Sequence, residues 1–535
     1  MKKKILGLLS LASLIPLTSC FFFDFIEKPT EKDDINTGKA YTEYKTPRYT
    51  SDFKSDNLNK DLLGLGYGQR YLPSTGDVKL LVIPIAMQDD SFSSNELALI
   101  RNGFFGKSSE TGWESVSSFY EKSSYGKLHI TGEVAPVCTL KATTSMAEST
   151  AKAYDKKNMT YTDVILSSAL SALGDSIDLT QYDNDNDGYI DGVWMVYSPR
   201  YSNNSDFYWA YTTWADDDKT YQGMKACCYA WASVDFLTRQ DYSTLLSSSS
   251  SADAHTFIHE TGHMLGLDDY YSYDYDYSTR TRTGNADTPV GGVDMMDFNI
   301  GDHDAYSKYF LGWLKPTVLT QEYLSANDYK LTLNSQNESG EAFLLPTYKD
   351  GSINYNGTPF DEYLLIEYYT PTGLNYQDSL KPYENNLSTY SQSGILVYHI
   401  NATVGKLLPD SNSSIIWDGC AYDKLPSYSS NWGYTFLYSL IYNNTASRGY
   451  DTNLKDEGMS YYRGRLISLL PATGKRINGQ KTGYSTNSSL YKKGTEFGKE
   501  VYDEFRFDDG TKSQYTFKVE STSDKNCTLK FGDNI

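Results

Sequence analysis

Two patterns of hydrophobic and polar positions divide this 535-residue chain. Between residues 76 and 320, short apolar runs typical of strands are mixed with segments whose apolar residues recur at helical spacing. The runs predict strands over 80–86, 127–137, 193–197 and 226–234. The helical spacing predicts helices over 95–105, 113–125, 161–173, 253–265 and 303–311. Strands and helices mixed in this way predict an α+β domain.

Beyond residue 320 the helical pattern fades. Short apolar runs at 363–368, 394–399, 515–519 and 527–531 are separated by segments rich in Asn, Ser and Gly. Spaced short strands with such turns predict a β-rich domain, and we expect a β-sandwich. Because a chain of this length exceeds one ordinary hydrophobic core, we expect two folded domains, 76–320 and 321–535.

The first 75 residues are expected to lie outside both domains. Three lysines precede an apolar stretch over 5–17, which is too short to span a membrane, and two small residues and Cys20 follow it. This order is typical of a bacterial lipoprotein signal, so we expect cleavage of 1–19 and lipid on the Cys20 thiol; an ordinary signal peptide is the alternative. Polar residues 20–75 predict a tether or a pro-segment. The mature protein is then expected outside the cytoplasm, anchored by its lipid to a bacterial membrane at the cell surface.

Composition narrows the classes of partner. The formal net charge of −20 argues against nucleic acid or an anionic membrane surface as an electrostatic partner. Five cysteines follow Cys20, and this odd, sparse number implies no disulfide framework. Nothing in these patterns predicts an oligomeric state.

The predicted helix over 253–265 contains an HExxH motif. His259 and His263 are four residues apart, so both imidazoles face one side of a helix and can share a metal ion. Glu260 lies between them and can act as a general base toward water. Gly266 can end the helix in a left-handed conformation, after which the chain turns back and Asp269 can reach the metal. Three protein ligands with one open position are typical of catalytic zinc.

Other side chains compete for these roles. Asp268 is the nearest alternative third ligand, because spacing alone does not exclude a slip of one residue. The next glutamate in the chain is Glu322, beyond the segment expected around the metal. His255 lies one turn before the first ligand and is expected to pack or to support it. His303 is a weaker ligand candidate or a helix cap.

An aspartate-rich segment at 183–191 predicts a second metal site. Carboxylates stand at the first, third, fifth and ninth positions of this segment, as in the first nine positions of an EF-hand loop: Asp183, Asp185, Asp187 and Asp191. Gly188 supplies the sharp turn. Position twelve is Trp194, so the bidentate glutamate of an EF-hand is missing. We expect a structural Ca²⁺ site, and a metal-free turn is the alternative.

Several segments together resemble one family. The residues from His259 to Asp269 are similar to the HExxHxxGxxD signature of the immune inhibitor A family of secreted bacterial metallopeptidases. Residues 291–297 resemble that family's Met-turn, with Met296 matching the methionine under the zinc, although a tryptophan is common where Val293 stands. Further similarity lies at 119–127, 183–191 and 305–314, and the whole resemblance covers roughly 78–400.

The resemblance implies a fold and a set of functional residues. It implies a zincin-like domain with a mixed sheet, an active-site helix and a Met-turn beneath the metal. The zinc ligands that it implies are His259, His263 and Asp269, and the implied base is Glu260.

The resemblance also implies an activity. We expect a zinc endopeptidase that hydrolyses peptide bonds of extracellular proteins, with the substrate lying along an edge strand of the sheet. Tyr306 and Tyr271 are candidates for stabilising the oxyanion. The rival hypothesis is a surface-binding lipoprotein or adhesin with a non-catalytic zinc site. Glu260 argues against this rival, because a structural site needs ligands but no base.

Overall fold

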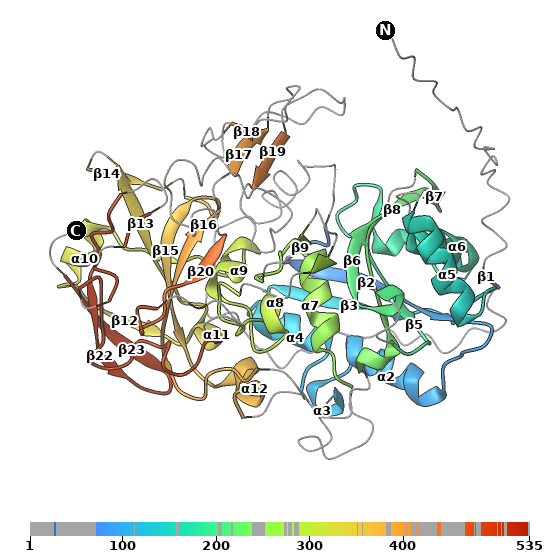
Figure 1. The fold of residues 1–535 in the computed structure, drawn as a ribbon, viewed down its shortest axis with the longest axis horizontal. Coiled ribbons are helices and arrows are strands. Elements are labelled where there is room, and N and C mark those ends of the chain that lie inside the picture. Colours follow the sequence, from blue (N-terminus) through green and yellow to red (C-terminus); the bar gives the residue numbers. More distant parts are fainter. Residues whose placement is uncertain are drawn as a thin grey trace, which may run out of the picture.

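The structure is a computed structural model in which residues 71–402 and 466–532 are described apart from short gaps, the longest at 238–251. Outside these ranges it describes strand segments at 26–27, 404–407, 415–416 and 436–439. Figure 1 shows the N-terminal half, blue to green, on the right and the C-terminal half, yellow to red, on the left. Helices α7 (His255–Met264), α8 (Met295–Phe298) and α9 (Ala305–Phe310) lie between the two halves.

The N-terminal half is built on a mixed eight-stranded sheet in the order β1-β4-β2-β5-β8-β6, with β3 also pairing β2 and β7 pairing β8. Its strands are β1 (Ile26–Glu27), β2 (Gly76–Ala86), β3 (Leu128–Val134), β4 (Cys138–Leu140), β5 (Tyr189–Tyr197), β6 (Tyr211–Trp214), β7 (Thr220–Tyr221) and β8 (Met224–Ser233). The central strands β2, β5 and β8 are parallel, whereas β6 runs antiparallel at the edge. The strand β1 at the opposite edge also pairs antiparallel with its neighbour β4, so both edges of the sheet carry a reversed strand.

Alternation along the central strand divides the side chains between two cores. Leu80 and Val82 of β2 face a cluster that includes the apolar residues of α2 (Ser94–Phe105), α4 (Val116–Ser123) and α7. Leu81 and Ile83 face a second cluster with α5 (Thr144–Asp155) and α6 (Tyr161–Leu173). Helices cover both faces of the sheet. Successive residues in the middle of the central strands are therefore buried on one face or the other, which explains the continuous hydrophobic runs.

The C-terminal half is β-rich, as predicted. One mixed sheet has the order β11-β13-β15-β16-β20 with β14 beside β13, and a second, antiparallel sheet has the order β12-β23-β22-β21. Their bounds are β11 (Thr317–Val318), β12 (Lys330–Asn334), β13 (Phe343–Lys349), β14 (Ser352–Asn354), β15 (Glu362–Tyr369), β16 (Gly394–Asn401), β20 (Ile467–Leu469), β21 (Glu496–Phe497), β22 (Phe517–Thr522) and β23 (Asn526–Phe531). Both sheets contribute to one apolar cluster, so they pack face to face.

The two halves share a core. Leu364 and Ile366 of β15 belong to the cluster between the C-terminal sheets, whereas Tyr363 and Leu365 belong to the cluster that contains α7 and α9. The first C-terminal sheet therefore packs with its other face against the helices of the N-terminal half. The predicted boundary at residue 320 separates two patterns of secondary structure, but the hydrophobic core is continuous across it.

Most of the predicted elements are confirmed, with shifts of a few residues at their ends. The prediction missed α5 and several strands, among them β4, β6, β12 and β13. It also missed three short helices in the C-terminal half, α10 (Gln321–Ala326), α11 (Gln336–Ser339) and α12 (Tyr376–Leu380). Part of the N-terminal segment belongs to the fold, because β1 pairs antiparallel with β4 and Leu72 is buried in the core beside α7. No helix in the described part of the chain is long and apolar enough to cross a membrane.

Candidate metal centre

The helix that carries the HExxH motif ends as the spacing predicts. Gly266 has a φ of +101°, a conformation that a side chain resists. The Gly266 N–H donates to His263 O over 2.9 Å, and the Leu267 N–H donates to Gly262 O over 3.0 Å. These bonds satisfy carbonyls at the end of α7 and reverse the chain. The reversal brings Asp269 back beside the helix.

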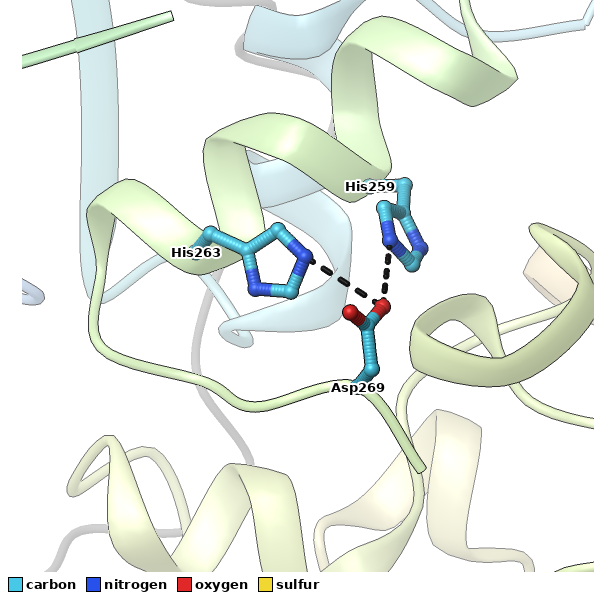
Figure 2. Close-up of side chains that lie close together, drawn as sticks. All are labelled: His259, His263 and Asp269. Carbon is cyan, nitrogen blue, oxygen red and sulfur yellow. Dashed lines mark ion pairs between the residues drawn. The ribbon is translucent and has the colours of Figure 1, made fainter. Parts of the chain in front are cut away.

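His259, His263 and Asp269 converge on one point (Figure 2). Asp269 Oδ1 lies 2.9 Å from His259 Nε2 and 3.3 Å from His263 Nε2. Neighbouring ligand atoms of a tetrahedral zinc with bonds of about 2.0–2.1 Å lie roughly 3.3 Å apart, so these separations are close to those of a metal site. His259 and Asp269 are buried, and His263 is partly exposed.

Backbone carbonyls fix which ring nitrogens face the carboxylate. His259 Nδ1 donates to Met295 O over 2.8 Å, and His263 Nδ1 donates to Leu267 O over 2.7 Å. A carbonyl only accepts, so each Nδ1 carries a hydrogen, and each ring, when neutral, presents its Nε2 lone pair toward Asp269. Three electron-pair donors thus face one point. A divalent cation satisfies all three, so these residues fit zinc.

The negative charge of the buried Asp269 needs a positive charge beside it. Burial would raise the pKa of Asp269, but the imidazoles of His263 and His259 hold it well below its usual range. Burial lowers the pKa of His263, but Asp269 outweighs that effect and raises it to about 10. The carboxylate is therefore ionised at any physiological pH. Its countercharge is either a proton on an imidazole or a bound metal ion.

Helix α8, which contains the predicted Met-turn residue, contacts both His259 and Tyr270, the residue that follows Asp269. Its Met295 carbonyl accepts from His259, and its Met296 carbonyl accepts from the Tyr270 N–H over 2.8 Å. The Met296 side chain is fully buried, and its Sδ lies 2.6 Å from where a Cβ on Gly262 would stand. Only a residue without a side chain allows this contact, so α7 and α8 pack closely beneath the ligands.

Glu260 lies beside the ligands on α7 and is buried. Burial raises its pKa, while the nearby imidazoles of His263 and His259 oppose that shift. Its Oε2 accepts from Thr212 Oγ1 over 2.9 Å. Thr212 belongs to the edge strand β6, which the sequence prediction missed. A carboxylate next to the ligands and held by a neutral donor is suited to accept a proton.

The alternative ligands are not part of the group. Among the described residues, the metal-compatible cluster at this helix contains Asp269 and not Asp268. His255 instead lies between Asp253 and Asp378, 2.8 Å and 3.2 Å from their carboxylates. This agrees with the packing role expected for it.

His303 neither joins the cluster nor caps a helix. The N-cap of α9 is Asp304, whose side chain accepts from the Ser307 N–H, so the capping hypothesis for His303 is wrong. The His303 ring is buried against Phe119 and Tyr120. Burial lowers the pKa of His303 well below its usual value, which keeps the ring neutral.

The two tyrosines predicted to stabilise an oxyanion lie in different surroundings. Tyr306 is buried in the shared core, with its ring centroid 6.3 Å from that of Phe310. Tyr271 is half-buried and follows directly on the anchored Tyr270. The oxyanion role stays a prediction for both residues.

The predicted calcium loop brings three of its four carboxylates together. Asp183, Asp185 and Asp187 each offer an oxygen within 4.8 Å of the others. Asp183 also accepts from the Asp187 and Gly188 N–H groups, over 2.9 Å and 3.0 Å. Gly188 has a φ of +88°, as expected for the sharp turn. The loop thus gathers oxygen donors of the kind that Ca²⁺ prefers.

Asp191, the fourth predicted ligand, lies deeper than the other three. Its carboxylate accepts from the Asn184 N–H over 2.7 Å and is buried. Burial, together with Asp185 and Asp187, raises the pKa of Asp191 to about 8. A cation in the loop would offset this crowding of negative charge. Cys20, the predicted lipidation site, lies outside the described residues.

Sequence reasoning missed the groups that support the ligands. The carbonyls of Met295 and Leu267 carry no signal in the sequence, because every residue has one. Thr212 lies in a strand of four residues, too short for an alternating pattern to stand out. No family model matches the chain, and no curated protein matches it. A functional proposal therefore rests on the geometry of the site and on the sequence motifs themselves.

Proposed function

We propose that the protein is a zinc-dependent endopeptidase with a zincin-type fold backed by a β-sandwich. One observation carries the proposal: the Nε2 atoms of His259 and His263, oriented by backbone carbonyls, face the same oxygen of Asp269. The resemblance of residues 259–269 and 291–297 to the immune inhibitor A family supports it. So does α8, which packs beneath the ligands as a Met-turn would.

We assign these side chains two roles, metal ligand and general base. His259, His263 and Asp269 would hold zinc, which when bound supplies Lewis-acid chemistry and lowers the pKa of water. Glu260 is not a ligand in this arrangement. It takes a proton from the attacking water and delivers it to the leaving amine of the peptide.

The edge strand offers a place for an extended substrate. β6 is the last strand in the order of the N-terminal sheet and contacts α7. A peptide that adds a strand along β6 would gain main-chain hydrogen bonds and pass beside Glu260. This favours a protein or peptide substrate over a small hydrolysable ester.

Metal removal and restoration test this function. The full-length protein is incubated with casein before and after dialysis against a chelator, and zinc is then added back in stoichiometric amount. We expect cleavage to be lost with the metal and restored with it. Absence of cleavage in every state, with one zinc bound, would favour the binding-protein hypothesis.

The third ligand has a matched control in the next residue. Asp269→Ala should weaken zinc binding, whereas Asp268→Ala should leave it intact, because only Asp269 faces the two imidazoles. Zinc content after gel filtration distinguishes the two variants. Equal zinc loss in both would show that the acidic turn matters as a whole.

We also propose two features outside the catalytic chemistry. Ca²⁺ bound by the loop at 183–191 would stabilise the start of β5, because Ile190 and Asp191 are buried there. A lipid on Cys20 would anchor the protein to a membrane outside the cytoplasm. Ca²⁺ binding and lipid attachment would both occur whether or not the zinc site is catalytically active.

A further inference from the structure

Strand β6 brings a hydroxyl group to Glu260. Thr212 Oγ1 lies 2.9 Å from Glu260 Oε2 and 2.9 Å from the main-chain O of the same residue. A carboxylate and a carbonyl both accept, so the threonine hydroxyl is the donor, and its single hydrogen is shared between the two oxygens of Glu260. Both contacts tie residue 212 to the proposed general base.

Alternation along β6 explains why Thr212 faces the helix. Tyr211 packs on Trp231 with ring centroids 5.4 Å apart, and Trp231 belongs to the core on the face of the sheet away from α7. Trp214 packs against the core that contains α7. Successive side chains of a strand point to opposite faces, so Thr212 shares the face of Trp214. Strand pairing thus directs the hydroxyl toward Glu260.

The strand also limits how the hydroxyl can move. Thr212 pairs with Ala230 of β8 in an antiparallel register, which fixes its backbone. A β-branched side chain has few χ1 rotamers available. A glutamate, by contrast, has three side-chain torsions. A fixed donor can therefore hold the Glu260 carboxylate in one orientation next to the two histidines.

We propose that Thr212 is a positioning residue, which holds the Glu260 carboxylate in its reactive orientation and links the base to the strand beside which the substrate lies. Since this role depends on the proposed peptidase function, its failure must be distinguishable from failure of that function. The Thr212 hydroxyl contacts Glu260 and is not part of the metal-compatible cluster of His259, His263 and Asp269. Its effect should appear in kcat, with KM and zinc content unchanged.

Three variants of the full-length protein test this role. Thr212→Val keeps the shape and removes the hydroxyl, Thr212→Ser keeps the hydroxyl, and Thr332→Val removes an exposed threonine hydroxyl from β12 in the second C-terminal sheet. We expect kcat on a peptide substrate to fall about 10- to 100-fold in Thr212→Val, as for the loss of one hydrogen bond to a charged group. Thr212→Ser should recover most of it, and Thr332→Val should match the wild type.

Crystal structures of the wild type and the two Thr212 variants give a readout besides activity. We expect the Glu260 carboxylate to keep its place in Thr212→Ser and to turn away in Thr212→Val, with one zinc per chain in both and unchanged melting temperatures. A wild-type kcat in Thr212→Val, an unmoved carboxylate, or a Thr212→Ser variant as slow as Thr212→Val would overturn the inference. A wild type without zinc-dependent cleavage would instead overturn the peptidase function, and the carboxylate position would still test the contact.

Discussion

His255 Nε2 lies 3.2 Å from Asp378 Oδ2, although 123 residues separate them in the chain. His255 is the first residue of α7, and Asp378 belongs to α12 of the C-terminal half. The imidazole also stacks on Trp113 at 3.9 Å between ring centroids, and the carboxylate accepts from the Gly301 N–H. The helix that carries the candidate ligands is thus tied at its start to the other half of the molecule.

This contact predicts a loss of stability at alkaline pH. Burial lowers the pKa of His255, but Asp378 and Asp253 outweigh it and raise the pKa to about 9, from the ordinary histidine value of 6.5. A raised folded-state pKa stabilises the fold fully below pH 6.5, and this stabilisation is lost as pH rises through 9. The loss is on the order of 3 kcal/mol. Urea denaturation at pH 6 and pH 9.5 measures it, with Asp378→Asn as the comparison. An equal pH dependence in both proteins would rule out this pair as its source.

Gly262→Ala should destabilise the protein. Alanine in a helix normally stabilises by about 0.4–1 kcal/mol over glycine, but here its Cβ would stand 2.6 Å from Met296 Sδ. We expect a net cost of about 1–3 kcal/mol, typical of overpacking. Gly174→Ala is the control, because its nearest atom would be 3.6 Å away. Thermal unfolding compares them. The Gly262→Ala change should cost less stability in a Met296→Ala background than in the wild type, and an equal cost in both backgrounds would place the strain elsewhere.

Calcium should raise the melting temperature through the loop at 183–191. A ligand at 100 times its Kd stabilises by about 2.7 kcal/mol. The double variant Asp185→Ala/Asp187→Ala should lose this response, because it removes two of the three clustered carboxylates. Asp218→Ala removes an exposed carboxylate outside the cluster and should respond like the wild type. If calcium leaves the wild type unchanged, the loop is a turn without metal.

Lipid attachment at Cys20 is a prediction from sequence alone. Mass spectrometry of the mature N-terminus should find Cys20 as the first residue, carrying two acyl chains or more, because a single chain gives only marginal membrane binding. Cys20→Ala should release the protein from the membrane fraction. An unmodified N-terminus at another residue would exclude the anchor.

The sequence predicts local features of the candidate site well. The spacing from His259 through Gly266 to Asp269 depends on one helix and one turn, and a helical repeat with a left-handed glycine determines both. The structure brings the side chains of His259, His263 and Asp269 together as that spacing requires. The loop at 183–191 is local in the same way.

Contacts across the fold could not be predicted. The pairing of His255 with Asp378, and of Glu260 with Thr212, depends on how sheets and helices pack over long separations in the chain. The hydrophobic core shared by the two halves also depends on packing between distant segments, since alternate residues of β15 face two different clusters. A pattern of period two predicts a strand with two faces, but it does not say what covers each face.

The central claim is that Glu260 activates water beside zinc, and the comparison of the wild type with Glu260→Gln tests it most directly. Zinc content and casein cleavage are measured on the same preparations. We predict one zinc per chain in both proteins, because Glu260 is not a ligand, and a loss of activity on the order of 10²–10⁴-fold in the variant. Cleavage by Glu260→Gln at the wild-type rate, or absence of bound zinc in the wild type, would contradict the account.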